Sequence, residues 1–90
     1  MARGFVLITV EPGKEMEAYR GLSNAKGIVK AIPLLGDIDF LVVIEAKEPN
    51  EIARIVIKKI RPIKGVVSTK TLIEDEFLKQ FEDLANDTKW

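Results

Sequence analysis

The 90-residue chain contains no cysteine and no histidine. Without cysteine, a disulfide framework and a thiolate metal site are both excluded. Without histidine, the chain lacks the commonest catalytic base and transition-metal ligand, and a hydrolase triad cannot be built. The glycines are scattered singly, so there is no phosphate-binding loop. We therefore expect no metal, no cofactor and no enzymatic activity.

Long hydrophobic runs are also missing. No apolar stretch approaches the roughly 20 residues of a membrane-spanning helix, and the first four residues lead into strand-like sequence instead of a signal peptide. These absences predict a cytoplasmic protein with no membrane partner. Ninety residues suffice for one domain with a small core, which oligomerisation would stabilise further. Glutamine occurs once whereas isoleucine, lysine and glutamate are plentiful, a composition typical of thermophiles.

Charge is balanced overall but unevenly distributed. Residues 1–72 hold 12 of the 14 lysine and arginine residues but only 8 of the 14 acidic ones, and the remainder forms an acidic tail. A nucleic-acid interface would need a stronger basic bias than this body has. We expect no direct nucleic-acid partner, and a solvated tail that can fold back on a basic surface.

Hydrophobic patterning predicts six main elements. Strands are expected over residues 5–10, 28–35, 38–46 and 66–74, and helices over residues 14–23 and from Pro49 to about Pro62. Pro33 indicates an edge strand or a bulge, because proline cannot donate to a sheet ladder. The dipeptide Gly36-Asp37 predicts a tight turn.

The order of these elements predicts an α+β fold. Two similar strand-helix-strand units with right-handed crossovers give a ferredoxin-like βαββαβ sandwich, with a four-stranded antiparallel sheet and both helices on one face. We place this domain at residues 1–74 and an acidic amphipathic extension at residues 75–90. A short helix in the extension would carry the apolar stripe Phe77, Leu78, Phe81, Leu84 and Ala85. Trp90 is either disordered or an anchor.

The helices have recognisable apolar and basic sides. The expected buried residues are Met16, Tyr19 and Leu22 on the first helix, and Ile52, Ala53, Val56, Ile60 and Ile63 on the second. The polar side of the second helix carries Arg54, Lys58, Lys59, Arg61 and Lys64, which we interpret as a solvated face.

The second face of the sheet is predicted to be apolar as well. If Ile38, Phe40, Val42 and Ile44 face the helices, then Leu41 and Val43 point the other way, and the first strand is apolar on both faces. Such a surface is rarely left exposed on a soluble monomer. We expect a second copy to cover it, sheet to sheet, in a two-fold dimer; the alternative cover is the C-terminal segment.

Few polar residues have side chains that could catalyse a reaction or bind a ligand. Asp37 and Asp39 can act as acid and base, bind a cation, or accept hydrogen bonds from the backbone at a turn. The hydroxyls of Ser68, Thr69 and Thr71 either express β-propensity or bind a small polar ligand. Their combination with a Gly-Asp turn that leads into another strand favours a small-ligand site.

Three segments resemble a known family. The segments FVLITVEPGKE, KGIVKAIPLLGDIDFLVVIEA and IKGVVSTKTLIE are similar to the ligand-sensing (RAM) domain of the Lrp/AsnC feast/famine transcriptional regulators, over about residues 4–74. The most specific pieces are the turn at residues 36–39 and the Gly-Val-x-x-Thr-x-Thr ending at residues 65–71. Because the first strand begins near Phe5, the resemblance implies a stand-alone module without the DNA-binding helix-turn-helix.

The resemblance also implies an assembly and a ligand. Domains of this family pair through their sheets, the dimers form rings of commonly eight and sometimes ten subunits, and amino acids bind between dimers. The implied ligand-binding residues are Gly36, Asp37, Asp39, Ser68, Thr69 and Thr71. Backbone amides near Gly36 would receive the carboxylate, an acidic side chain the ammonium, and hydroxyls would fix orientation. Ile38 replaces the family's usual aromatic residue, and residues 33–35 are less polar than usual.

Two functions are compatible with these observations, besides a purely structural oligomer with an empty site. The first is an amino-acid-binding homo-oligomer that serves as an accessory to transcription regulation, with a full-length regulator of the same family as a possible partner. The second is a dimeric α+β barrel enzyme of oxygenase or isomerase type. Such enzymes usually need a histidine or a dense polar cluster between helices and sheet, whereas this chain offers only Tyr19 and a few hydroxyls. The binding module is therefore favoured.

Overall fold

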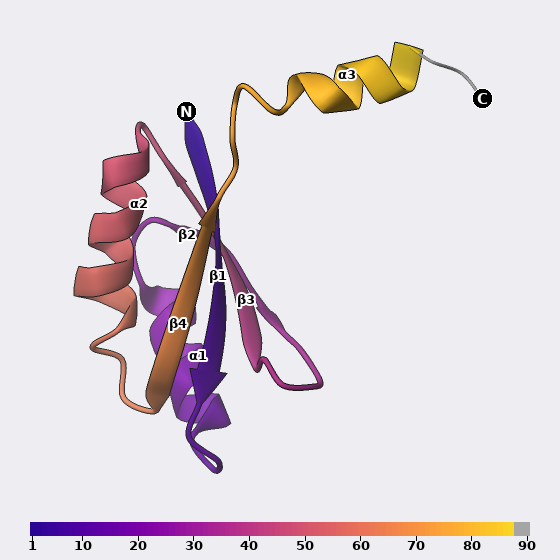
Figure 1. Ribbon diagram of the computed structural model, residues 1–90. Coiled ribbons are helices and arrows are strands. Elements are labelled where there is room, and N and C mark those ends of the chain that lie inside the picture. Colours follow the sequence, from indigo (N-terminus) through magenta and orange to yellow (C-terminus); the bar gives the residue numbers. More distant parts are fainter. Residues whose placement is uncertain (88–90) are drawn as a thin grey trace.

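The computed structural model describes residues 1–87 and has the predicted ferredoxin-like α+β fold (Figure 1). Trp90 lies outside the described residues. In order along the chain, the elements are β1 (Ala2–Val10), α1 (Glu15–Asn24), β2 (Ile28–Pro33), β3 (Phe40–Ala46), α2 (Pro49–Ile55), the π-helical turn η1 (Val56–Ile60), β4 (Val66–Ile73) and α3 (Gln80–Asp87).

The four strands form one antiparallel sheet in the order β2-β3-β1-β4. Val6 of the central strand β1 lies opposite Val42 of β3 on one side and Thr71 of β4 on the other. The helices α1 and α2 cover one face of this sheet (Figure 1). The edge position that Pro33 predicts is confirmed, because β2 pairs only with β3 and its register shifts between Ile28 and Lys30.

The core lies between the sheet and the two helices. β1 contributes Val6, Ile8 and Val10, which leaves Phe5 and Leu7 on the second face. The other buried residues are Ala2, Ala18, Leu22, Phe40, Val42, Ile44, Ala46, Ile52, Val56 and Ile60. At Gly4, a Cβ atom would lie 2.8 Å from Cγ2 of Ile52, so glycine in β1 is what allows α2 to pack this closely.

The buried sides of the helices differ from the prediction at three positions. Met16 and Tyr19 are exposed, because α1 turns Ala18 and Leu22 toward the sheet, four residues apart on one side. Ala53 is also exposed, since Ile52 and its i+4 and i+8 neighbours form the buried side of α2 and η1. The predicted stripe of Ile52, Val56 and Ile60 is confirmed, and Ile63 packs against it.

The β2–β3 connection is longer than the predicted tight turn. β2 ends at Pro33 and β3 begins at Phe40, and the backbone N–H of Leu34 donates to the carbonyl of Asp39 at 2.8 Å. Gly36 takes a φ of +143° within this six-residue loop, a backbone conformation that favours glycine. Gly36 and Asp37 thus lie on an exposed loop, with Leu35 fully exposed beside them.

The second face of the sheet, called the open face below, is apolar at its centre. It consists of Phe5, Leu7, Leu41, Val43, Ile32 and Leu72, with Arg3, Lys30, Glu45, Ser68 and Lys70 around them. α3 does not cover it, because this helix projects away from the end of the sheet (Figure 1). The first turn of the extension is separate from α3: Oδ1 of Asp75 accepts the N–H of Leu78 at 2.9 Å, and the helix begins at Gln80.

Candidate functional site

A cavity of about 380 Å³ lies where η1 passes the beginning of β4. Its lining residues are Arg61, Val66, Val67, Ser68 and Thr69. Two valines give it an apolar wall, and one guanidinium and two hydroxyls give it polar groups. A pocket of this composition suits a small molecule with an anionic end and an apolar side chain.

Arg61 is held in this cavity by a hydrogen bond. It is the residue that ends η1, and its Nε donates to Oγ1 of Thr69 at 3.2 Å. The side chain is thereby directed toward β4, with its terminal N–H groups beyond that bond. A guanidinium in a fixed position can bind a carboxylate through two parallel hydrogen bonds. Sequence reasoning placed Arg61 on the solvated side of the helix, and the residue is exposed; what the sequence did not reveal is its hydrogen bond to Thr69.

The residues implied by the resemblance do not form one cluster within a single copy. Ser68 and Thr69 line the cavity, but they point to opposite faces of β4, since Ser68 lies opposite Thr9 and Thr69 opposite Ile8. Thr71 lies on the helix side with Thr69, opposite Val6, and does not line the cavity. The six implied residues are therefore divided between β4 and the β2–β3 loop.

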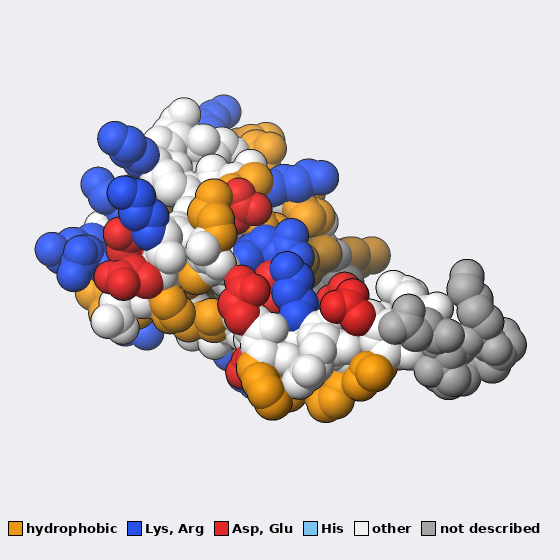
Figure 2. Space-filling view, turned by 90° about the horizontal axis from the view of Figure 1, so that it is seen from above, with side chains coloured by type: hydrophobic (Ala, Val, Ile, Leu, Met, Phe, Trp, Pro, Cys, Tyr) orange, Lys and Arg blue, Asp and Glu red, His pale blue; other side chains and the backbone are white. Residues whose placement is uncertain are grey.

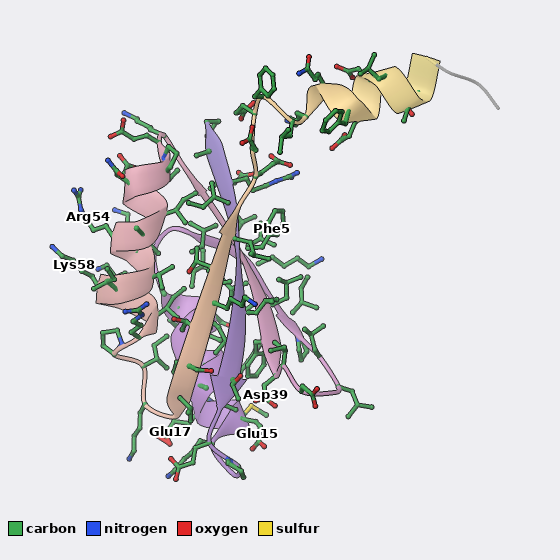
Figure 3. The ribbon with its side chains drawn as sticks, viewed as in Figure 1. Phe5, Glu15, Glu17, Asp39, Arg54 and Lys58 are labelled. Carbon is green, nitrogen blue, oxygen red and sulfur yellow. The ribbon has the colours of Figure 1, made fainter. Side chains whose placement is uncertain are left out.

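Asp39 fixes that loop to the central strand. Its Oδ2 accepts the N–H of Val10 at 2.8 Å, and its own N–H donates to the carbonyl of Ile8 at 2.9 Å. Asp39 and Thr69 thus lie on opposite sides of β1, about 10 Å apart at the usual strand spacing. Figure 3 places Asp39 at the end of the molecule where Glu15 and Glu17 of α1 also lie.

A second polar cluster ties the first strand to the C-terminal extension. Nη2 of Arg3 lies 2.8 Å from Oε2 of Glu74, and its guanidinium stands 5.6 Å from the centre of the Phe5 ring. The hydrogen bond from Arg3 lowers the pKa of Glu74, against a smaller opposing effect of desolvation. The hydrogen bond to Glu74 and the negative charge of that carboxylate raise the pKa of Arg3, with smaller contributions from the charges of Glu45 and Glu82.

The interior of the domain offers no polar chemistry. Among residues 1–86 no polar or charged side chain is buried, so the buried core between helices and sheet is hydrocarbon. A shallow cavity of about 300 Å³ at the N-terminal end of α1 is lined almost wholly by apolar groups of Met16, Tyr19, Pro33 and Phe40, beside Glu15. The described part of the chain has no cluster of three acidic side chains placed to hold a metal ion.

None of the helices between residues 1 and 87 is both long enough and apolar enough to cross a membrane.

Comparison with known proteins gives a family match. The model of the Lrp/AsnC ligand binding domain matches residues 3–84. It covers β1 from Arg3 onward, the other three strands, α1 and α2. It continues through the first five of the eight residues of α3, ten residues past the segment in which the sequence resemblance was seen.

Two curated proteins illustrate the relationship. A homocitrate synthase of Sulfurisphaera tokodaii is 48% identical over 52 residues, which are 58% of this chain and 11% of that protein. An uncharacterized HTH-type transcriptional regulator of Pyrococcus furiosus is 30% identical over 79 residues, covering 84% of this chain and 53% of the regulator. The chain thus spans about a tenth of the first relative and about half of the second.

Solved structures share the fold. A hypothetical protein from Pyrococcus horikoshii has a TM-score of 0.75 at 25% identity, covering 83% of this chain and 90% of that one. AsnC of E. coli also has a TM-score of 0.75, at 20% identity, with 81% of this chain and 50% of AsnC covered. A transcriptional regulator of Neisseria meningitidis, solved as an L-Met complex, has a TM-score of 0.73 at 13% identity, covering 83% and 50%.

Proposed function

This chain belongs to the Lrp/AsnC ligand binding domain family, and on that basis we propose that it is a regulatory module that binds an amino acid in the Arg61 cavity. One observation carries the proposal: the Arg61 guanidinium donates to Thr69 in a cavity that Ser68, Val66 and Val67 also line. These groups match the carboxylate and the side chain of an apolar amino acid.

Each residue of the site then has a physical role. Arg61 binds the carboxylate, Ser68 adds a hydroxyl donor, and Thr69 orients Arg61 by accepting its Nε–H. The ligand ammonium needs an anion, and within the same copy the β2–β3 loop lies on the far side of β1. We therefore assign this role to Asp37, with the Gly36 backbone, of a neighbouring copy. Asp39 holds that loop in place, and Thr71 extends the row of hydroxyls on β4.

Self-association is the second part of the proposal. The open face carries six apolar side chains, and Figure 1 shows that neither the helices nor α3 lies over it. Sheet-to-sheet packing of two copies would remove this surface from water. A ring of such dimers, of eight or ten subunits, would bring a β2–β3 loop to the Arg61 cavity of the next dimer.

The relatives suggest two kinds of regulated partner. The Pyrococcus regulator is named as an HTH-type transcriptional regulator, which favours a role in transcription, either directly or by mixed assembly with a DNA-binding relative. The second candidate is regulation of a metabolic enzyme, and the specific observation in its favour is the 48% identity to a segment of a homocitrate synthase. In both cases the module senses a metabolite and does not catalyse a reaction, consistent with its hydrocarbon interior.

Calorimetric titration of the full chain with each of the twenty amino acids tests the ligand. We expect one apolar amino acid to bind with up to one molecule per subunit. Arg61→Gln should weaken that binding by about 10- to 100-fold, since hydrogen bonds to charged groups contribute about 1.5–3 kcal/mol. Arg20→Gln is the matched control, because Arg20 is an exposed arginine on α1.

Three results would contradict the assignment. The first is that none of the amino acids binds at millimolar concentration. The second is that Arg61→Gln and Arg20→Gln reduce the affinity equally, which would place the ligand elsewhere. The third is that only amino acids with charged side chains bind, since Val66 and Val67 provide no partner for a second charge.

A further inference from the structure

The C-terminal extension carries an apolar surface that its own domain leaves uncovered. The side chains of Phe77 and Phe81 are 74% and 60% exposed, and Leu78 is 47% exposed between them. Figure 2 shows hydrophobic side chains along one side of the extension, which stands out from the rest of the molecule. Two phenyl rings and a leucine side chain in contact with water are unfavourable unless another surface covers them.

The direction of the extension is fixed at its root. The N–H of Glu74 donates to the carbonyl of Arg3 at 2.8 Å, the two side chains form an ion pair, and Lys79 lies 4.0 Å from Glu74. From this root α3 runs away from the end of the sheet, on the side opposite to α2 (Figure 1). In this arrangement the extension lies away from its own helices, and its apolar side is open to be covered by a second molecule.

Charge limits which surface of a second molecule can do so. Residues 75–87 contain five acidic residues and one lysine, and that lysine is directed to Glu74. Two extensions packed against each other would bring like charges together and would be mutually repelled. The complementary surface must be basic and must also offer apolar contact.

The outer side of α2 and η1 has both properties. Arg54 and Lys58 point from it into solvent (Figure 3), Lys59 follows, and Ile57 between them is 55% exposed. Within residues 1–86, no carboxylate forms an ion pair with Arg54, Lys58 or Lys59. Figure 2 shows lysine and arginine side chains gathered on this side of the molecule, away from the extension. The basic face of one copy is thus free to meet the acidic extension of another.

We propose that α3 of one copy packs along the outer side of α2 and η1 of a second copy. Phe77 and Phe81 cover Ile57 and the aliphatic stems of Arg54 and Lys58, while Glu82 and Asp83 meet the basic groups. The contact joins two different surfaces, so each copy uses both its extension and its basic face, and repetition leads to a closed ring or an open chain. Neither the open face nor the Arg61 cavity takes part.

Charge reversal on the full chain tests this contact. We expect Glu82→Lys/Asp83→Lys to weaken assembly beyond the dimer by about tenfold or more, because several exposed ion pairs each contribute up to about 1 kcal/mol. Lys58→Glu/Lys59→Glu should weaken it equally. In the variant with all four changes, the affinity of assembly beyond the dimer should return to within about threefold of that of the natural chain, because the two sites are coupled. Arg20→Glu/Lys26→Glu, which changes charge by the same amount on other exposed residues, should have little effect.

Native mass spectrometry and light scattering give the readout, at low and high salt. The apolar half of the contact is tested by Phe81→Ser, which replaces an exposed ring and should also reduce assembly. The proposal is overturned if both charge reversals leave the assembly unchanged or if the natural chain forms nothing larger than a dimer. It is also overturned if the variant with all four substitutions does not regain assembly beyond the dimer. If the natural chain assembles in this way but binds no amino acid, the proposed ligand binding is refuted and the proposed contact of α3 is still supported.

Discussion

The carboxylate of Asp39 accepts the backbone N–H of Val10 at 2.8 Å, and this bond joins the β2–β3 loop to the end of the central strand. The N–H of Asp39 completes the connection by donating to the carbonyl of Ile8 at 2.9 Å. A residue that the family resemblance implies as a ligand contact therefore has a structural function in this chain. Asp37, two residues earlier, is exposed at the loop and remains the candidate for contact with a ligand.

Removal of the Asp39 carboxylate should destabilise the domain. In Asp39→Ala the partly buried N–H of Val10 loses its acceptor, which should lower the free energy of unfolding by about 1–3 kcal/mol in urea denaturation. Asp39→Asn keeps a carbonyl oxygen and should lose less than about 1 kcal/mol. Equal losses in the two variants would show that the hydrogen bond does not determine the stability of this loop.

Close packing at Gly4 gives a second prediction. Gly4→Ala places a methyl group 2.8 Å from Cγ2 and 3.3 Å from Cδ1 of Ile52, both within a buried contact of β1 with α2. We expect a loss of about 1–3 kcal/mol in the free energy of unfolding, typical of overpacking. In an Ile52→Ala background the added methyl group should cost much less. A similar cost in both backgrounds would mean that the clash is not with Ile52.

The Arg3–Glu74 pair should contribute to stability in a pH-dependent manner. Hydrogen bonding from Arg3 lowers the pKa of Glu74 below its usual 4.5, so the folded state holds this proton less tightly than the unfolded state. The contribution is present above the unfolded pKa and is lost as pH falls through the folded pKa. Arg3→Gln should therefore reduce the stability at neutral pH and leave it nearly unchanged at strongly acidic pH.

Two measurements check this pair. Carbon-13 NMR titration should find the pKa of Glu74 higher in Arg3→Gln than in the natural chain, and denaturation at several pH values should show the two stability curves converging toward acid. Lys79→Gln is a control of the same charge change, since Lys79 lies 4.0 Å from Glu74 and contributes less to its pKa. A larger effect from Lys79 than from Arg3 would contradict the assignment.

Sheet pairing should depend on the centre of the open face. Leu41→Lys places an ammonium group at a position that the proposed dimer buries, next to Leu7 on β1. We expect the dissociation constant of the dimer, measured by sedimentation analysis, to rise at least about 100-fold, because an unpaired charge would lose its hydration. The fold should persist, since Leu41 does not face the helices. Leu34→Lys, on the exposed loop, is the matched control. A stable Leu41→Lys dimer would exclude this face as the interface.

Local sequence patterns predicted the element order because they depend on short-range physics. β-branched runs, helical spacing and Pro49 at a first helical turn placed the six main elements within a few residues. The predicted tight turn at residues 36–37 was wrong in length, since the bonds that shape the loop come from Asp39 to Ile8 and Val10 on another strand. Such contacts have no signature in the local sequence.

Only some of the residues that line the Arg61 cavity could be predicted from the sequence, because contacts between distant elements have no local signature. The hydroxyls of Ser68 and Thr69 follow from their positions on a strand, and both line the cavity. Arg61 was interpreted as a solvated residue and is exposed, but its hydrogen bond to Thr69 was not predicted, because it depends on where η1 ends relative to β4. The sequence shows which residues are available, and packing between distant elements determines which of them meet.

The sequence by itself determined the ferredoxin-like order, the edge position of Pro33 and an apolar surplus on both faces of the sheet, because these follow from periodicity and from backbone chemistry. Only the tertiary structure decided which side of β1 faces the helices. Both Val6/Ile8 and Phe5/Leu7 are apolar, and the choice depends on the fit of Ile52 over Gly4. Tertiary structure also decided that α3 leaves the open face bare, because the chain beyond the Arg3–Glu74 pair runs away from the end of the sheet.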